Sequence, residues 1–169
     1  MILGVIPARL NSTRFPSKVI FPLKGKPIIE HVYEKALQSN LLNKVIVAVD
    51  SEETKNAINC PNVIMTSDKH QSGTDRVAEV ANKFDCDVVV NIQGDEPMID
   101  PKIIDALVEK FENPLVEFAT VISKNLVAAD ILNPNVVKAF INEKKEIIEF
   151  KRNIFDSQIG GAYRHIGLY

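Results

Sequence analysis

The feature that most constrains the fold is an alternation of short apolar runs with segments of helical periodicity. Apolar, β-branched runs occupy Ile2–Ile6, Lys44–Val49 and Asp87–Ile92, and such continuous runs are typical of strands buried on both faces. Segments with a helical spacing of apolar residues lie between and after them, as in Ser72–Phe84 and Pro101–Phe111. Short links between strand and helix predict right-handed βαβ units. The expected fold class is therefore α/β, with a mostly parallel, Rossmann-like sheet flanked by helices.

Four other segments continue this alternation with weaker apolar patterns. The apolar spacing and the flanking turn residues predict four more elements. These are helices over Pro27–Ser39 and Glu52–Ile58, and strands over Asn62–Met65 and Glu117–Ser123.

The pattern changes after residue 125. Val136–Ile141 and Glu146–Phe150 read as two strands joined by a turn at Asn142–Lys145. Asn153–Ala162 contains a Gly-Gly pair and is predicted to be mobile, and Tyr163–Tyr169 is predicted to form one more strand. We therefore expect a smaller antiparallel portion near the C-terminus.

Length and charge limit the function classes. The 169 residues are about one domain long, so residues 1–169 are predicted to form a single domain. The net charge of −2 provides no overall field for a nucleic-acid partner, so an anionic ligand needs a local basic cluster. The N-terminal segment has no basic n-region and no cleavage site, so we expect a buried strand there and not a signal peptide. No apolar run is long enough to span a membrane.

The two cysteines, Cys60 and Cys86, are far apart and lack metal-ligand spacing. The plain interpretation is a reduced, cytoplasmic protein with two ordinary thiols, and a disulfide or metal role is the alternative.

A basic loop follows the first predicted strand. Residues 8–18, ARLNSTRFPSK, carry Arg9, Arg14 and Lys18 among small polar residues. Arginine forks and lysine ammonium groups bind phosphate oxygens, and ligands of α/β sheets bind beyond the carboxyl ends of strands. A solvated loop is the alternative. The sequence contains neither GxGxxG nor a P-loop motif, so neither a dinucleotide fold nor a P-loop enzyme is indicated.

Two further motifs follow predicted strands or open predicted helices. In QGDEP, Asp95 is placed to hold Mg²⁺ with Glu96 as a spare ligand, and the alternative is that these acids cap the helix near Pro101. In HQSGTDR, Ser72 and Asp75 resemble a capping box. A helix start presents free N–H groups to a base or phosphate, although plain capping explains the same pattern.

Four residues near the end could bind an acidic substrate. Arg152 and Arg164 could hold a carboxylate, His165 could hydrogen-bond hydroxyls or act as a base, and Tyr169 lies close by in the sequence. The alternative is that these side chains are scattered over the surface and bind no substrate.

Together, the strings IPARLNSTRFPSK, GKPIIEHV, HQSGTDRVAEV, VVNIQGDEP and RHIGLY resemble one family in order along nearly the whole chain. It is the CMP-KDO synthetases, or 3-deoxy-manno-octulosonate cytidylyltransferases, which have a nucleotide-diphospho-sugar transferase fold. The resemblance implies an enzyme that uses CTP and Mg²⁺ to activate 3-deoxy-manno-octulosonate (KDO), an acidic 2-keto sugar of lipopolysaccharide. The products are CMP-KDO and pyrophosphate.

The resemblance also implies residue roles. Arg9, Arg14 and Lys18 would contact the phosphates, and Asp95 would bind the metal, so these four form the predicted catalytic set. The predicted nucleotide contacts are Ala8, Arg9, Arg14, Lys18, Gln71, Ser72, Gly73, Arg76 and Gln93. The predicted substrate contacts are Arg152, Arg164, His165 and Tyr169.

The sequence departs from the family pattern at its end. Family members continue beyond the position of Tyr169 with a further helix, a second metal-binding aspartate and a part that supports homodimers. We therefore expect a chain truncated at its C-terminus, with the homodimer belonging to the full-length form. Two alternatives remain: a cytidylyltransferase for another 2-keto sugar acid such as sialic acid, or a truncated CTP-binding domain without activity. No nucleic-acid or membrane partner is expected.

Overall fold

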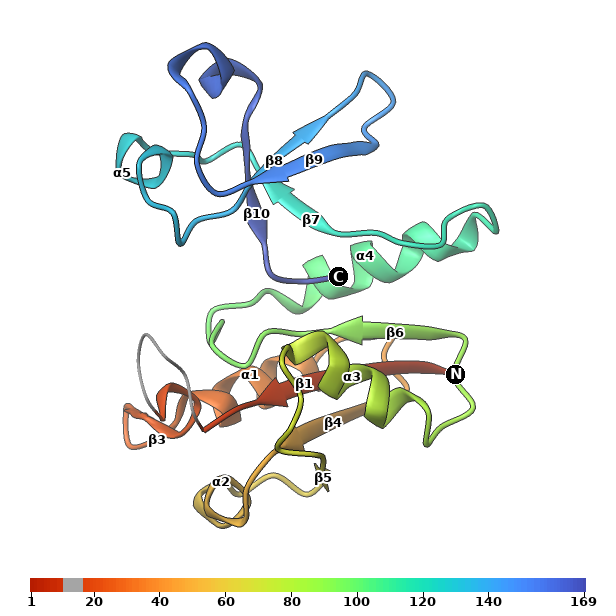
Figure 1. Cartoon of the computed structure of the whole chain (residues 1–169). Helices are drawn as coiled ribbons and strands as arrows, with labels where there is room; N and C mark the ends of the chain where they lie inside the picture. The colour runs from red at the N-terminus through yellow and green to blue at the C-terminus, as the bar shows by residue number, and fades with distance from the viewer. Residues whose placement is uncertain (11–16) are drawn as a thin grey trace. The chain divides into compact units, whose positions relative to one another are not determined.

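The computed structural model describes residues 1–10 and 17–169. The chain divides into two compact units (Figure 1). The first contains Met1–Ala119 together with Leu168–Tyr169, and the second contains Thr120–Gly167. The prediction of a single domain stays a prediction, and each unit is described by itself.

The first unit is built on a four-stranded parallel sheet. Its strands are β1 (Ile2–Ala8), β4 (Lys44–Val49), β5 (Val63–Met65) and β6 (Val88–Asn91), in the order β5-β4-β1-β6. All three pairings are parallel, which confirms the predicted sheet. The central strand β1 is buried from Leu3 to Ala8, as its continuous apolar run predicted.

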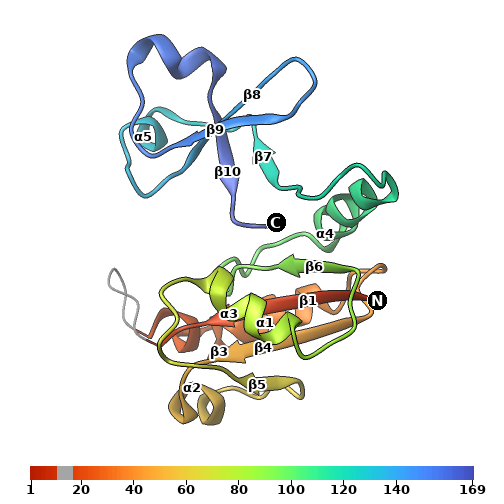
Figure 2. The ribbon, with the colours of Figure 1, turned by 45° about the vertical axis from the view of Figure 1, so that its right-hand side comes forward.

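Helices cover both faces of this sheet. The helix α3 (Gly73–Ala81) contacts β1, β4 and β6, while α1 (Ile28–Ala36) packs on the opposite face (Figures 1 and 2). The helix α4 (Pro101–Val108) contacts α1 and β6, and the short α2 (Glu52–Ala57) contacts β4 and β5. Pro101 opens α4 as predicted, whereas Pro27 is the N-cap of α1 and precedes its first turn.

The core between α3 and the sheet is aliphatic. Val77 and Val80 of α3 pack with Leu3, Val5 and Ile46 of the strands. Burial of each such side chain contributes about 1.5–3 kcal/mol, so the contact fixes α3 firmly against β1.

The structure adds short elements between β1 and α1 that the sequence did not predict. They are a 3-10 helix, η1 (Lys18–Ile20), and a hairpin of β2 (Pro22–Leu23) and β3 (Lys26–Pro27). Its two-residue turn places Lys24 at φ 51° and Gly25 at φ 88°. Positive φ at both central residues is the geometry that matches strand twist in tight hairpins.

The second unit contains an antiparallel sheet in the order β7-β10-β8-β9. Its elements are β7 (Val121–Ser123), α5 (Ala128–Ile131), β8 (Lys138–Ile141), β9 (Ile147–Lys151), the 3-10 helix η3 (Asp156–Gly161) and β10 (Tyr163–Ile166). The smaller antiparallel portion is thus confirmed. The segment predicted to be mobile contains η3, and the last strand ends three residues earlier than predicted.

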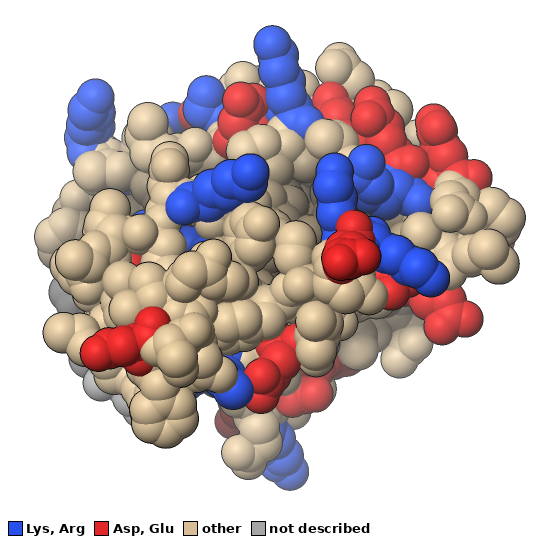
Figure 3. All heavy atoms as spheres, turned by 90° about the horizontal axis from the view of Figure 1, so that it is seen from above, with Lys and Arg blue, Asp and Glu red and all other residues tan. Residues whose placement is uncertain are grey.

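Charge is distributed without a single dominant sign on the face shown in Figure 3, where basic and acidic side chains are interspersed. Within the described part of the chain, no helix is long and apolar enough to cross a membrane.

Candidate active site

Three sequence motifs meet at the carboxyl end of β1. A Cβ atom added to Gly94 of QGDEP would lie 3.1 Å from the Pro7 carbonyl oxygen, and one added to Gly73 would lie 3.4 Å from the Pro7 ring. The missing side chains therefore let both segments approach the end of β1 closely. The residues on either side of these two glycines are brought beside the loop that leaves β1.

That loop, residues 9–18, was predicted from the sequence to bind phosphates, and for that predicted role it is called the phosphate loop below. Arg9 Nη1 donates to the Gln71 carbonyl at 2.9 Å, which joins the loop to the start of α3. Leu10 donates its N–H to Asp50 Oδ1 at 3.2 Å, and Ser17 donates its N–H to the Leu10 carbonyl at 2.9 Å. Arg14, a predicted phosphate contact, lies outside the described residues. The buried Ala8 is the last residue of β1, directly before the loop.

The end of the loop meets the QGDEP motif. Lys18 Nζ lies 2.7 Å from Asp95 Oδ2, and both side chains are about two-fifths exposed (39% and 40%). The sequence left open whether Asp95 caps the following helix. Asp100 is the N-cap of α4 and accepts from the Lys102 N–H at 3.0 Å, so that alternative is wrong. Asp95 therefore faces Lys18 rather than the start of α4.

Asp95 offers one carboxylate that a divalent metal ion could share with substrate phosphates. Among the described residues, no group of three or more His, Cys, Asp or Glu side chains could hold a metal. Magnesium is commonly bound by one or two carboxylates together with substrate phosphates. A half-exposed carboxylate next to a basic loop fits that pattern.

The start of α3 is a capping box, as the sequence indicated. Ser72 Oγ accepts from the Asp75 N–H at 3.1 Å, and Asp75 Oδ2 accepts from the Ser72 N–H at 3.0 Å. The Ser72 hydroxyl also donates to Asp75 Oδ2 at 2.7 Å, and this bond together with the one from the Ser72 N–H lowers the pKa of the Asp75 carboxyl. Gln71 is exposed and Ser72 and Gly73 are half-buried. Nucleotide contacts by these three residues stay a prediction.

Arg76 lies inside the first unit. Its side chain is fully buried and ion-pairs with Asp50, with Nη2 3.3 Å from Asp50 Oδ2. Nη1 donates to Thr66 Oγ1 and, at 3.2 Å, to the Ser67 carbonyl. Burial lowers the pKa of the guanidinium, and the nearby Asp50 opposes that shift. The predicted contact of Arg76 with cytidine therefore stays a prediction, while its contact with Asp50 is direct.

Glu79 of α3 contacts Ser67 and His70 in the segment that precedes the helix. Its Oε2 accepts from the Ser67 N–H at 2.9 Å and lies 2.7 Å from His70 Nε2. These interactions lower the pKa of Glu79 to about 2. The carboxylate thus holds the HQSGTDR motif against the helix that follows it.

Tyr169 belongs to the first unit, beside α3 and β6. Its hydroxyl lies 3.1 Å from Thr74 Oγ1, and its backbone exchanges hydrogen bonds with Asn91. A cavity of about 340 Å³ is bordered by these residues and by Phe118. Gln93 is also near, donating to Asn91 Oδ1 at 3.4 Å.

The other predicted substrate contacts lie in the second unit. Arg152 Nη1 donates to the Pro134 carbonyl at 3.0 Å, and Arg164 Nη1 lies 3.5 Å from Asp130 Oδ2. His165 Nε2 lies 2.9 Å from Thr120 Oγ1. Burial lowers the pKa of His165, which favours its neutral form. Substrate contacts by all three stay a prediction.

A family model for cytidylyltransferases matches residues 3–159. The chain is 39% identical to the 3-deoxy-manno-octulosonate cytidylyltransferase of Trichlorobacter lovleyi, over 99% of this chain and 74% of that relative. It is 40% identical to the enzyme of the same name from Chloroherpeton thalassium, over 98% of this chain and 71% of the relative. The chain belongs to the 3-deoxy-manno-octulosonate cytidylyltransferase family.

Solved structures agree with this family assignment. CMP:2-keto-3-deoxy-manno-octonic acid synthetase complexed with CTP superposes with a TM-score of 0.88 at 35% identity, over 99% of this chain and 72% of that one. Rv0371c of Mycobacterium tuberculosis in complex with manganese has a TM-score of 0.51 at 15% identity, over 64% of this chain and 58% of that one. The second likeness shows the fold alone. The resemblance predicted from the sequence motifs is thus confirmed, as is the α/β nucleotidyltransferase fold.

Three charged residues that the sequence analysis did not select make structural contacts within this cytidylyltransferase fold. They are Asp50 and Glu79, described above, and Lys138 of β8. Lys138 is fully buried and donates to the carbonyls of Asn133 and Arg152, each at 2.8 Å. Asp50 carried a usable signal, because it directly follows a predicted strand. Nothing local marked the other two.

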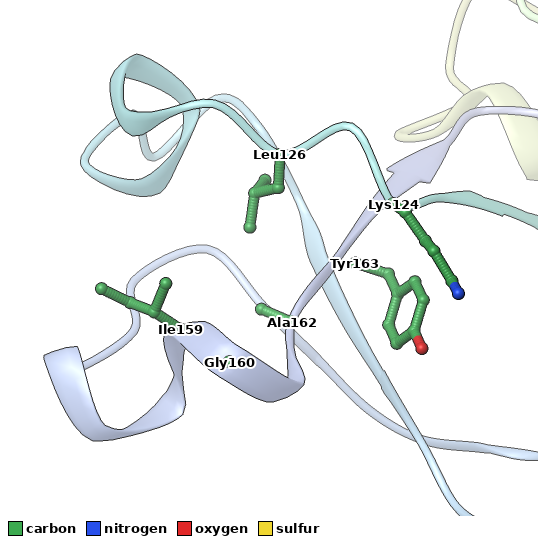
Figure 4. A pocket seen from close by; sticks show the side chains of 6 residues that line it. All are labelled: Lys124, Leu126, Ile159, Gly160, Ala162 and Tyr163. Carbon is green, nitrogen blue, oxygen red and sulfur yellow. The ribbon is translucent and has the colours of Figure 1, made fainter.

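The second unit of this family member also contains a cavity of about 360 Å³ that the sequence did not indicate. Figure 4 shows the Lys124 side chain beside the Tyr163 ring, with Leu126 and Ile159 on the other side. None of its lining residues is among the predicted site residues.

Proposed function

We propose that this chain transfers the cytidylyl group of CTP to KDO, giving CMP-KDO and pyrophosphate for lipopolysaccharide biosynthesis. The observation that carries the proposal is the meeting of three motifs at Pro7, in a chain of this family. The Lys18–Asp95 pair, 2.7 Å apart, places a cation and a carboxylate together at that point. A nucleoside triphosphate with its metal needs both kinds of group.

The reaction is a single displacement at phosphorus. The C2 hydroxyl oxygen of the sugar forms a bond to the α-phosphorus of CTP, and the bond from that phosphorus to the bridging oxygen breaks. Pyrophosphate leaves with the bonding electrons, and the hydroxyl proton passes to solvent. Positioning and charge neutralisation account for most catalysis of this kind, so no protein nucleophile is required.

The catalytic roles follow from the charges. Arg9, Arg14 and Lys18 bind phosphate oxygens, and their positive charge stabilises the departing pyrophosphate. Asp95 holds Mg²⁺, which supplies further neutralisation of the phosphates when bound. Lys18 lies within ion-pair distance of Asp95. The phosphate oxygens bound by Lys18 can therefore also reach the metal held by Asp95.

The remaining predicted residues divide between the two substrates. Residues at the end of β1, at the start of α3 and after β6 surround the nucleotide: Ala8, Gln71, Ser72, Gly73, Arg76 and Gln93. The acidic sugar is bound by Arg152, Arg164, His165 and Tyr169. The burial of His165 favours neutral imidazole, which suits hydrogen bonding to sugar hydroxyls.

We further propose a cytoplasmic location and a homodimer in the full-length form. Cys60 and Cys86 are both free thiols, which supports a reducing compartment. Dimerisation rests on family membership alone.

Pyrophosphate release from CTP tests the proposal. With Mg²⁺ present, we expect release with KDO and little with sialic acid, and a reversed preference would contradict the choice of sugar. Calorimetric titration with CTP and Mg²⁺ separates binding from turnover. CTP binding without turnover on either sugar would favour a binding domain without activity. Arg14→Ala is expected to weaken CTP binding by about tenfold or more, as for a lost charge-assisted contact.

A further inference from the structure

Asp50 connects the phosphate loop to a buried cation. It directly follows β4, and its two carboxylate oxygens have different partners. Oδ1 accepts the Leu10 N–H at 3.2 Å, whereas Oδ2 lies 3.3 Å from Arg76 Nη2. The Asp50 side chain is only 12% exposed. One carboxylate therefore serves a loop on one side and a helix on the other.

Leu10 lies near the start of the phosphate loop. Its N–H is bound by Asp50, and its carbonyl accepts the Ser17 N–H at 2.9 Å. The hydrogen bond places Ser17 beside Leu10. Arg9 immediately precedes Leu10 and Lys18 immediately follows Ser17. A shift of Leu10 would therefore displace both Arg9 and Lys18.

Arg76 determines where Asp50 must lie. Its guanidinium is fully buried, and Asp50 is its only ion-pair partner among the described residues. A buried cation that loses its counter-ion is strongly destabilising, because desolvation is then no longer compensated. The two partners thus stay together, and Oδ1 of Asp50 is held pointing at Leu10.

We propose that Asp50 is a positioning residue for the phosphate loop, and that Arg76 acts on CTP through Asp50 rather than by touching the base. The inference rests on the proposed function in one respect, namely that the phosphate loop binds CTP. It adds a residue that the family resemblance did not assign, and it changes the role expected of Arg76.

The geometry makes a specific demand for two acceptor oxygens. An asparagine at position 50 has a single acceptor, for which Arg76 and Leu10 would compete. The charged donor wins, because charge-assisted hydrogen bonds are about twice as strong as neutral ones. Asp50→Asn should therefore release Leu10 while keeping a partner for Arg76. Replacing Arg76 by methionine as well would free that oxygen for Leu10.

The experiment compares Asp50→Asn with Asp50→Asn/Arg76→Met, and with Val80→Ala as the control. Val80 is a fully buried residue of α3 that packs on the sheet, so its truncation lowers stability without touching the loop. We expect Asp50→Asn to raise the KM for CTP about tenfold or more, since small misplacements at a reacting centre are costly. The KM for KDO should change less than about threefold, because the sugar makes no contact with Asp50 in this scheme.

The double variant should recover most of the lost CTP affinity, and Val80→Ala should keep the KM for CTP within about twofold of wild type. If the double variant binds CTP more weakly than Asp50→Asn, Arg76 touches the nucleotide and the inference is wrong. An Asp50→Asn variant that matches Val80→Ala in its KM for CTP would also overturn it.

Amide hydrogen exchange of Leu10 gives a readout that is independent of turnover. Exchange should be fast in Asp50→Asn and in Asp50→Ala/Arg76→Met, and slow in wild type and in Asp50→Asn/Arg76→Met. The two double variants bury no unpaired charge, so they decide the question even if Asp50→Asn does not fold. Equal exchange in the two double variants would overturn the anchoring role. Absence of pyrophosphate release by wild type would instead contradict the proposed function, whatever the exchange result.

Discussion

The two units of the molecule use charged side chains in different ways. In the first unit, Arg76 pairs with Asp50 beneath the phosphate loop, and Lys18 pairs with Asp95 at its end. In the second unit, the buried Lys138 donates to two backbone carbonyls. In the proposed function the first arrangement serves an anionic ligand, whereas the second links two backbone segments of its own unit. The role proposed for the first arrangement is therefore chemical, whereas Lys138 stabilises the fold of its own unit.

The largest expected effect is at the site itself. Asp95→Asn removes the carboxylate proposed to hold Mg²⁺, and we expect kcat to fall roughly 10²–10³-fold, as for other lost transition-state contacts. Asp100→Asn is a matched control, because asparagine caps a helix about as well as aspartate. Initial rates of pyrophosphate release at saturating substrates measure both. Similar kcat values for the two variants would remove Asp95 from the catalytic set.

A smaller effect is expected from the buried lysine of the second unit. Lys138→Met leaves the carbonyls of Asn133 and Arg152 without their donor, which should lower the free energy of unfolding by about 1–3 kcal/mol. Urea denaturation measures this loss, with the exposed Lys144→Met as the control. CTP affinity should stay near the wild-type value. A large loss of CTP affinity without loss of stability would break the distinction between the two units.

The smallest effect concerns His165 and pH. Burial lowers its pKa below the ordinary value of 6.5, so the unfolded chain binds a proton more readily than the folded one. This contribution to stability is complete above about pH 6.5 and is lost as the pH falls below it. We expect the free energy of unfolding of His165→Gln to fall less than that of wild type between about pH 6.5 and 5. Parallel pH profiles would contradict the pKa shift.

Much of the first unit could be predicted because its local patterns are strong. The strands β1 and β4 are buried on both faces, so their apolar runs are continuous and conspicuous. The Ser72–Asp75 capping box is encoded within four residues. Ligands of parallel sheets bind beyond the carboxyl ends of strands, which is why the phosphate loop and Asp95 were chosen as candidates, and their role stays a prediction.

The second unit was harder to predict in detail. In its edge strand β9, the apolar residues Ile148 and Phe150 are 66% and 43% exposed. An apolar residue in this strand is therefore not necessarily a buried one. The segment with the Gly-Gly pair contains η3, although glycine favours irregular backbone. The shorter extent of β10 likewise follows from pairing with β7 and β8, which no local pattern shows.

The amino-acid sequence by itself determined the parallel α/β architecture, the antiparallel portion and the family, because periodicity and motif spacing are local properties of the chain. Only the tertiary structure decided which charged groups face each other. It showed that Asp100 rather than Asp95 caps α4, and that Arg76 is buried against Asp50. The Asp50–Arg76 pair joins residues 26 positions apart in the chain, and its energy depends on burial and distance. Neither quantity exists until the chain is folded.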